Sequence, residues 1–209
     1  QLEVIPHAQL TKLMQSNRDL EFFSLLKEQS LSEVMRALPH STAQLRQDLF
    51  VLSFLQCKSD GFFVEFGATN GIDWSNTHLL ETQYGWNGIL AEPAKGWHND
   101  LQSNRNCHIN TECVWHTTGQ TLRFNETQTA YLSTIDAFSN KDKHKADRRN
   151  GTRYDVQSIS LMDLLKKYDA PSHIDYLSID TEGSELAILS AFDFSQYSFS
   201  IITCEHNYT

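Results

Sequence analysis

The chain has 209 residues, of which 40% are hydrophobic, 11% aromatic and 21% charged, a composition typical of one compact globular domain rather than a disordered, collagenous or repeat protein. Asp and Glu number 26 against 17 Lys and Arg, so the formal net charge is −9 at pH 7. Such an acidic chain lacks the positive field that nucleic acids and anionic membranes require, so we expect neither as a partner.

No apolar run approaches the ~20 residues that a membrane-spanning helix needs. The sequence begins with Gln1 and has no charged-then-apolar secretory leader, so we expect an excised or processed fragment. The four cysteines form no CxxC pair and no zinc-type spacing with histidines. We interpret them as free thiols in a reducing compartment and therefore expect a cytoplasmic protein. They are Cys57, Cys107, Cys113 and Cys204.

Residues 1–57 have a helical pattern, because apolar residues recur there every three or four positions. Ser30 and Glu33 have the spacing of a capping box, which predicts that a short helix begins at Ser30 and ends at Pro39. A longer helix is predicted to follow Ser41 and Thr42. We expect residues 1–40 to be a helical extension and residues 41–209 to be the main domain.

After Asp60-Gly61 the pattern changes to short apolar runs that alternate with amphipathic stretches. The runs predict strands at Phe62–Gly67, Gly88–Glu92, Cys107–Val114, Ile174–Asp180 and Phe199–Glu205. Helices are predicted at Asn76–Tyr84, Lys95–Asn104 and Ser184–Phe192. Strands that are apolar on both faces and alternate with helices predict an α/β fold, with a mostly parallel sheet covered by helices on both faces.

The interval Gln120–Tyr168 breaks this alternation. It predicts a hairpin from Thr121–Phe124 and Tyr131–Ile135, a strand near Tyr154–Ile159 and a helix through Leu161. It also contains five Lys or Arg residues within 141–150. This basic run is either a solvated surface loop or a lid that attracts an anionic group on an acceptor substrate.

The first predicted strand carries Glu65 and ends at Gly67, and a second glycine, Gly71, follows. Glycines here allow a tight turn and close approach of a ligand to the backbone, but the dinucleotide pattern GxGxxG is absent. Glu65 is a poor neighbour for a pyrophosphate and suits a ligand with an ammonium and a sulfonium. Glu92, 21 residues after Gly71, has the spacing of a ribose-hydroxyl acceptor. Together these features favour S-adenosylmethionine over NAD, although each alone could be an ordinary loop or strand end.

Several motifs in order make the resemblance specific: GFFVEFGATNG at 61–71, SNT at 75–77, GWNGILAEP at 85–93, IDYLSIDTEGSE at 174–185 and ITCEHN at 202–207. The chain from about Ser41 onward resembles the FkbM-type S-adenosylmethionine-dependent methyltransferase family. The resemblance implies a Rossmann-like methyltransferase fold, S-adenosylmethionine as cofactor, and methylation of a hydroxyl on a sugar, glycan or secondary metabolite.

The same resemblance implies a set of cofactor-binding residues. They are Glu65, Gly67, Ala68, Asn70, Gly71, Ser75, Asn76, Thr77, Glu92 and Asp180. The hairpin with which such sheets end is missing after the Glu205-His206-Asn207 strand end, so we expect the domain to be incomplete at its C-terminus.

Methyl transfer from a sulfonium is an in-line displacement, and an aliphatic hydroxyl must lose its proton to react well. Asp180 ends the fourth core strand, and Glu205, His206 and Asn207 end the fifth, so we expect these side chains at one edge of the sheet. Asp180, Glu205 and His206 are the predicted catalytic residues, with His206 as the base. Asp180, Glu205 and Asn207 are the predicted ligands if a divalent metal such as Mg²⁺ takes part.

Helix capping is the alternative role for the acidic residues after the fourth strand. Asp180 or Thr181 could cap the helix that follows, and Glu182 and Glu185 fit the first turn of that helix as well as they fit a site.

We therefore predict an S-adenosylmethionine-dependent O-methyltransferase that acts on a small-molecule or glycan acceptor. An inactive descendant that serves as an interaction module is the alternative. A nucleotide-dependent oxidoreductase is a weaker third hypothesis, because GxGxxG is absent and Glu65 is acidic.

Overall fold

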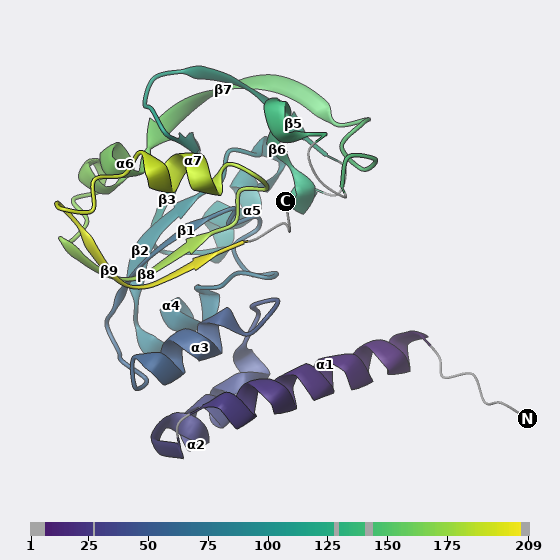
Figure 1. The fold of residues 1–209 in the computed structure, drawn as a ribbon, viewed down its shortest axis with the longest axis vertical. Helices are drawn as coiled ribbons and strands as arrows, with labels where there is room; N and C mark the ends of the chain where they lie inside the picture. Colours follow the sequence, from purple (N-terminus) through teal and green to yellow (C-terminus); the bar gives the residue numbers. More distant parts are fainter. Residues whose placement is uncertain (1–6, 27, 128–129, 141–143, 206–209) are drawn as a thin grey trace, which may run out of the picture.

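The computed structural model describes residues 7–26, 28–127, 130–140 and 144–205 (Figure 1). Its centre is a five-stranded, fully parallel sheet with the strand order β3-β2-β1-β8-β9. The bounds of these strands are β1 Phe62–Phe66, β2 Asn87–Ala91, β3 His108–Asn110, β8 His173–Ile179 and β9 Ser198–Cys204. The predicted parallel α/β architecture is confirmed.

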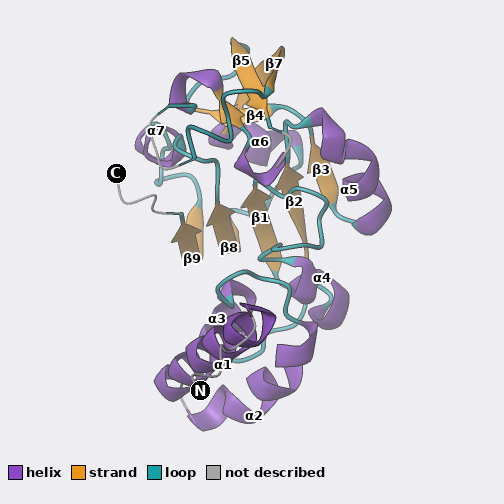
Figure 2. Cartoon of the chain, turned by 90° about the vertical axis from the view of Figure 1, so that its right-hand side faces the viewer, coloured by secondary structure: helices purple, strands orange, loops and turns teal. Residues whose placement is uncertain are grey.

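Helices cover both faces of the parallel sheet because its strands alternate apolar side chains to either side. Phe63 of β1 packs with Leu49 and Leu79 on one face, and Val64 packs with Leu164 on the other. The first face is covered by α2 Glu28–Ala37, α3 Gln47–Phe54, α4 His78–Tyr84 and α5 His98–Asn104, and the second by α6 Leu161–Lys167 and α7 Glu185–Ser190. Figure 2 shows the parallel strands side by side above the N-terminal helices.

A second sheet, with the order β4-β7-β5-β6, lies across the carboxyl ends of the parallel strands (Figures 1 and 2). Its strands are β4 Cys113–Trp115, β5 Thr121–Glu126, β6 Thr134–Ile135 and β7 Thr152–Ser160. The predicted hairpin is confirmed, because β5 and β6 pair antiparallel. Its second strand is shorter than predicted, since Ala130–Leu132 form a 3-10 turn, η3.

The prediction of one strand at Cys107–Val114 is wrong. The chain leaves the parallel sheet after Asn110, whose side chain is buried and bonds the Glu112 carbonyl, and β4 then pairs with β7 in the second sheet. A continuous apolar run cannot distinguish one strand from two that belong to different sheets. All four cysteines are free thiols, as expected.

Two details of the N-terminal helices also differ from the prediction. α1 spans His7–Leu25, and α2 begins at Glu28, so Ser30 lies inside the helix, where its buried hydroxyl contacts Ser53 Oγ at 2.9 Å instead of capping. α3 begins at Gln47, because Arg46 has a left-handed backbone, with φ 63°.

In the described part of the chain no helix is both long and apolar enough to cross a membrane. The further 3-10 turns are η1 Leu38–His40, η2 Lys95–Trp97 and η4 Asp136–Phe138.

Candidate active site

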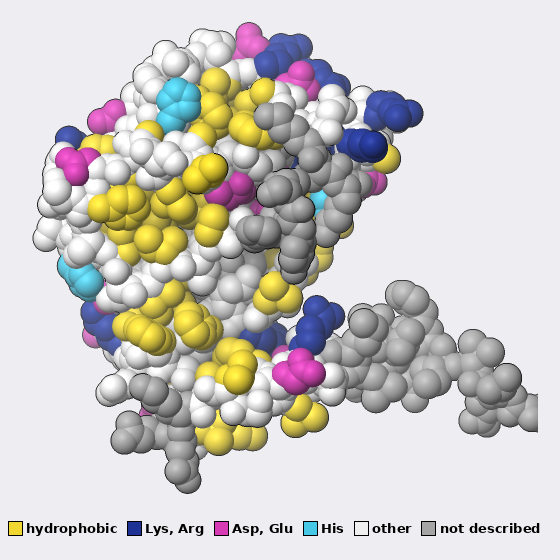
Figure 3. All heavy atoms as spheres, viewed as in Figure 1, with side chains coloured by type: hydrophobic (Ala, Val, Ile, Leu, Met, Phe, Trp, Pro, Cys, Tyr) yellow, Lys and Arg dark blue, Asp and Glu magenta, His cyan; other side chains and the backbone are white. Residues whose placement is uncertain are grey.

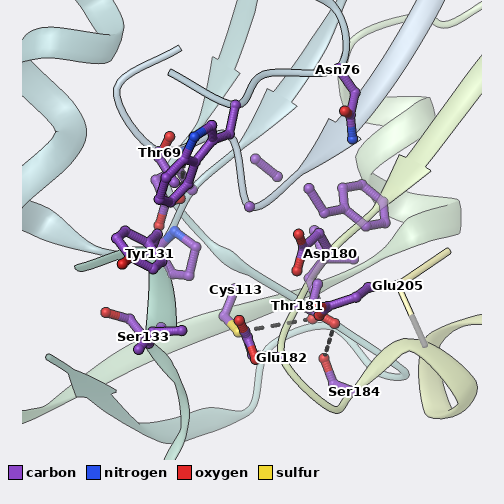
Figure 4. Close-up of a pocket in the computed structure, with 18 of the residues that line it drawn as sticks. Thr69, Asn76, Cys113, Tyr131, Ser133, Asp180, Thr181, Glu182, Ser184 and Glu205 are labelled. Atoms are coloured by element: carbon purple, nitrogen blue, oxygen red, sulfur yellow. Dashed lines mark hydrogen bonds between the residues drawn. The ribbon is translucent and has the colours of Figure 1, made fainter. Parts of the chain in front are cut away.

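A cavity of about 340 Å³ lies where β1, β2 and β8 end, beneath the second sheet (Figure 4). Its volume is in the range of small-molecule sites. One part of its wall is apolar and comes largely from the second sheet. That part is formed by Cys113, Val114, Phe124, Leu132 and Ile135. The lining also contains the carboxyl groups of Asp180, Glu182 and Glu205.

The turn after β1 has a glycine because the neighbouring strand end leaves no space for a side chain. Gly67 has φ +73°, and a Cβ there would lie 2.1 Å from the carbonyl oxygen of Asp180. The turn thus brings the backbone of residues 67–69 against the end of β8. Gly67 and Thr69 both line the cavity.

Glu92 lies at the end of β2, and its carboxyl group is buried against the same turn. Its two oxygens accept hydrogen bonds from the backbone N–H groups of Thr69, at 2.9 Å, and Ala94, at 2.8 Å. Burial raises the pKa of Glu92 to about 7, although the two hydrogen bonds act to lower it. The charge of Glu126 contributes to the rise. Each oxygen keeps a second lone pair, so the ionised group can accept hydroxyl donors from a ligand in the cavity.

Glu65, in contrast, does not line the cavity. One of its oxygens accepts a hydrogen bond from the backbone N–H of Asn76, at 2.7 Å, and the other accepts from the hydroxyls of Ser75, at 2.9 Å, and Thr77. The fully buried guanidinium of Arg105 lies 3.9 Å from that second oxygen. The carboxylate therefore fixes the 75–77 loop from behind, and direct contact between Glu65 and a cofactor stays a prediction that this geometry does not favour.

Arg105 connects the same loop to its surroundings. It donates to the carbonyl of Gly71, at 2.9 Å, to both loop hydroxyls, and to Glu81 Oε2, at 2.7 Å. A Cβ on Gly71 would lie 2.6 Å from the Arg105 side chain, so this glycine makes room for the arginine. Arg105 follows α5 and carries no motif, and no signal in the sequence identified it.

Asn76 is the member of this loop that reaches the cavity. Its Nδ2 donates to Ser178 Oγ at 2.9 Å, which fixes the orientation of the amide. Among the described residues its Oδ1 has no hydrogen-bond partner, although only 9% of the residue is exposed. A buried acceptor without a partner is costly, so Asn76 is suited to a ligand that brings an N–H or O–H group.

Three carboxyl groups gather after the fourth and fifth strands of the parallel sheet. One oxygen each of Asp180, Glu182 and Glu205 lies within 4.8 Å of the others. Burial raises the pKa of Asp180 well above its usual value, and the nearby carboxylate of Glu205 contributes to the rise. Glu182 also accepts from the buried Arg148, at 2.7 Å, so it is already engaged with a cation. Asp180 and Glu205 therefore have the chemistry of Mg²⁺ ligands, but their role as such stays a prediction.

The β8–α7 turn explains what the neighbouring acidic residues do. Glu185 accepts from the backbone N–H groups of Thr181, at 2.9 Å, and Gly183, at 3.0 Å. α7 begins after Ser184, and neither Asp180 nor Thr181 occupies its N-cap position. The capping alternative is thus wrong for those two residues, and Glu185 has a structural role in the turn.

The segment between β5 and β7 closes the cavity over this turn. Arg148 is fully buried and donates to the Leu132 carbonyl, at 2.7 Å, as well as to Glu182. Thr134 Oγ1 donates to the Glu182 carbonyl at 3.0 Å. The interpretation of 141–150 as a solvated loop therefore fails for Arg148, and His144 from the same run lines the cavity. Residues 141–143 lie outside the described residues.

The structure brings part of the predicted site together. The predicted residues that line the cavity are Gly67, Asn76, Glu92, Asp180 and Glu205. Those that support it from outside its lining are Glu65, Ala68, Asn70, Gly71, Ser75 and Thr77. His206 and Asn207 lie outside the described residues. Trp74 and Tyr131 also line the cavity and were not predicted from the sequence, although the position of Trp74 just before the SNT motif is a signal for it.

Comparison with known proteins gives one match. The family model described as the methyltransferase FkbM domain matches residues 65–209, which begins at Glu65 and includes every strand after β1. No curated protein matches the chain. No solved structure matches it either.

Proposed function

We propose that this chain, which belongs to the FkbM methyltransferase family, uses S-adenosylmethionine to methylate a hydroxyl group of a small-molecule or glycan acceptor. One observation carries the proposal: the carboxyl groups of Glu92, Asp180 and Glu205 line the same cavity, at the carboxyl ends of parallel strands. Ligands of α/β proteins bind at this edge of the sheet.

The residues of the cavity fit the cofactor from end to end. The apolar wall of Val114, Phe124 and Ile135 suits a flat base, and the carboxylate of Glu92 suits the two ribose hydroxyls. Asn76 Oδ1, which no described residue bonds, suits the ammonium of the methionine part. When bound, the cofactor supplies a methyl group on a positively charged sulfur.

The chain's own contribution to the reaction is alignment and removal of a proton. Asp180, whose pKa is raised, can take the hydroxyl proton of an acceptor as general base. Glu205 beside it stabilises the protonated form of Asp180, because a shared proton relieves the repulsion between two carboxylates. The fixed loop at 75–77 and Glu92 would hold the donor in one orientation, which would align it for in-line transfer.

Isothermal titration with S-adenosylmethionine tests the proposal, and transfer of a radiolabelled methyl group to a panel of sugars and hydroxylated metabolites tests the reaction. We expect binding by the wild-type chain, and loss of transfer with retained binding in Asp180→Asn. If the wild-type chain does not bind the cofactor, the proposed function is wrong.

One observation favours an interaction module as the second candidate. Figure 3 shows hydrophobic side chains gathered on the face that includes α7 and β9, where Leu186, Phe194 and Ile202 are exposed. An exposed apolar face is typical of a binding surface. Cofactor binding without methyl transfer to any acceptor of the panel would favour this alternative.

A further inference from the structure

Trp74 and Tyr131 form an aromatic corner in the cavity wall. Their ring centroids lie 4.4 Å apart, and the ring planes meet at 78°. Both side chains line the cavity, and 47% of Trp74 and 43% of Tyr131 are exposed. Trp74 comes from the loop after β1 and Tyr131 from the turn before β6, so the corner forms only where two distant segments meet.

The backbone at Trp74 shows that this corner is held in place. Trp74 has φ 62°, a left-handed conformation that a bulky aromatic residue rarely adopts. A bridge between Ala43 and Trp74 ties the residue to the segment before α3. Residues kept in such conformations cluster at ligand sites, where surrounding contacts maintain the strain.

The acidic side chains that line the cavity face the same space as the corner. The described residues that line the cavity include five carboxyl groups and no Lys or Arg side chain. The carboxyl groups belong to Asp73, Glu92, Asp180, Glu182 and Glu205. Figure 4 shows Tyr131 on one side of the cavity, with Asp180 and Glu205 on the other. A group between them meets aromatic rings on one side and carboxyl oxygens on the other.

We propose that the aromatic corner of Trp74 and Tyr131 binds the positively charged sulfonium of the methyl donor and thereby distinguishes the donor from its uncharged product. This inference rests on the proposed function and goes beyond it, because it assigns charge selectivity to two residues outside the carboxyl groups. The faces of Trp and Tyr attract a cation within about 6 Å of the ring centroid. S-adenosylhomocysteine has a neutral sulfur and loses this attraction, which favours product release.

The test is isothermal titration of the full chain with three ligands. S-adenosylmethionine carries the charge on sulfur, S-adenosylhomocysteine has none, and sinefungin carries an ammonium on the carbon that replaces the sulfur. We expect Trp74→Leu to weaken S-adenosylmethionine and sinefungin by about two- to thirtyfold, the range of a cation–aromatic contact, and to leave S-adenosylhomocysteine within about twofold. Trp74→Phe, which keeps a ring, should retain most of the selectivity.

The three ligands separate the possible outcomes. Tyr131→Leu is a second variant in case Trp74→Leu misfolds, and Phe54→Leu, an exposed aromatic on α3 outside the cavity lining, is the control that should change nothing. Equal weakening of all three ligands, or no weakening, overturns the inference while the proposed function stands. Failure of the wild-type chain to bind either S-adenosyl compound overturns the proposed function and the inference with it.

Discussion

Cofactor affinity should depend on pH through Glu92. Burial raises the pKa of this carboxyl to about 7, and we propose that a ligand diol donates to its ionised form. If only the ionised form accepts both hydroxyls, about one-eleventh of the sites are competent at pH 6 and nearly all at pH 8. The affinity for S-adenosylhomocysteine should therefore be about tenfold weaker at pH 6 than at pH 8.

Isothermal titration between pH 6 and pH 8.5 measures this slope. S-adenosylhomocysteine is the better probe, because its neutral sulfur is insensitive to the charge of Asp180. Glu92→Gln, which keeps the shape but does not titrate, should bind weakly at every pH. Asp180→Asn should retain the slope. A wild-type affinity that does not vary with pH, or a slope that survives in Glu92→Gln, would refute the reasoning.

The sign for stability is opposite to that for binding. The folded chain holds the Glu92 proton more tightly than the unfolded chain, in which the pKa of Glu92 is 4.5. The stabilising contribution is therefore complete below pH 4.5 and is lost as the pH rises through about 7, by about 3 kcal/mol in the unliganded protein. Burial also raises the pKa of Asp48 to about 6, so its stabilising contribution to the fold is lost over a similar pH range. Because Asp48 does not line the cavity, its titration should not contribute to the pH dependence of binding.

Three further predictions concern the supports of the cavity. Gly67→Ala should destabilise the fold by about 3 kcal/mol or more in urea unfolding, because the methyl group meets a backbone carbonyl at 2.1 Å. Gly119→Ala is also at positive φ, but no atom of the described residues lies within 4 Å of the added methyl group, so it should cost about 1–2 kcal/mol. Equal costs would contradict the clash. Arg105→Met should cost about 3–5 kcal/mol by the same measurement, because it leaves the buried Glu65 and the partly buried Glu81 without their cation. A cost below about 1 kcal/mol would be inconsistent with that network. Arg148→Met should speed trypsin cleavage between residues 144 and 151 by roughly tenfold or more, because Glu182 then no longer anchors this segment. An unchanged cleavage rate would show that other contacts hold the segment in place.

The parallel sheet could be predicted because its strands are buried on both faces. Runs such as Ile174–Asp180 are apolar without alternation, and such runs, when helices separate them, are typical of a parallel sheet covered on both sides. The cavity edge followed from the same reasoning, since Glu92 and Asp180 come directly after strands of one sheet. Their placement needed only the topology of the sheet.

The side-chain partners could not be predicted in the same way. Glu65 has the position of a ligand contact, but its oxygens accept hydrogen bonds from the 75–77 loop. It also forms an ion pair with Arg105, which lies 40 residues later in the sequence. The second sheet was only partly visible, because its strand β4 continues an apolar run that starts in the first. Such features depend on which distant segments meet, and local periodicity carries no information about that.

The hydrogen bonds between Glu65 and residues 75–77 determine when the entropy of this loop is lost. Because the carboxylate and its arginine partner lie within the core, the loop is ordered as the chain folds rather than when a ligand arrives. Preorganisation of this kind removes a conformational cost from association, so a larger share of the contact energy becomes affinity. Binding at this rim should accordingly show a small entropic penalty, and variants that loosen the loop should lose affinity through entropy while the contacting atoms stay the same.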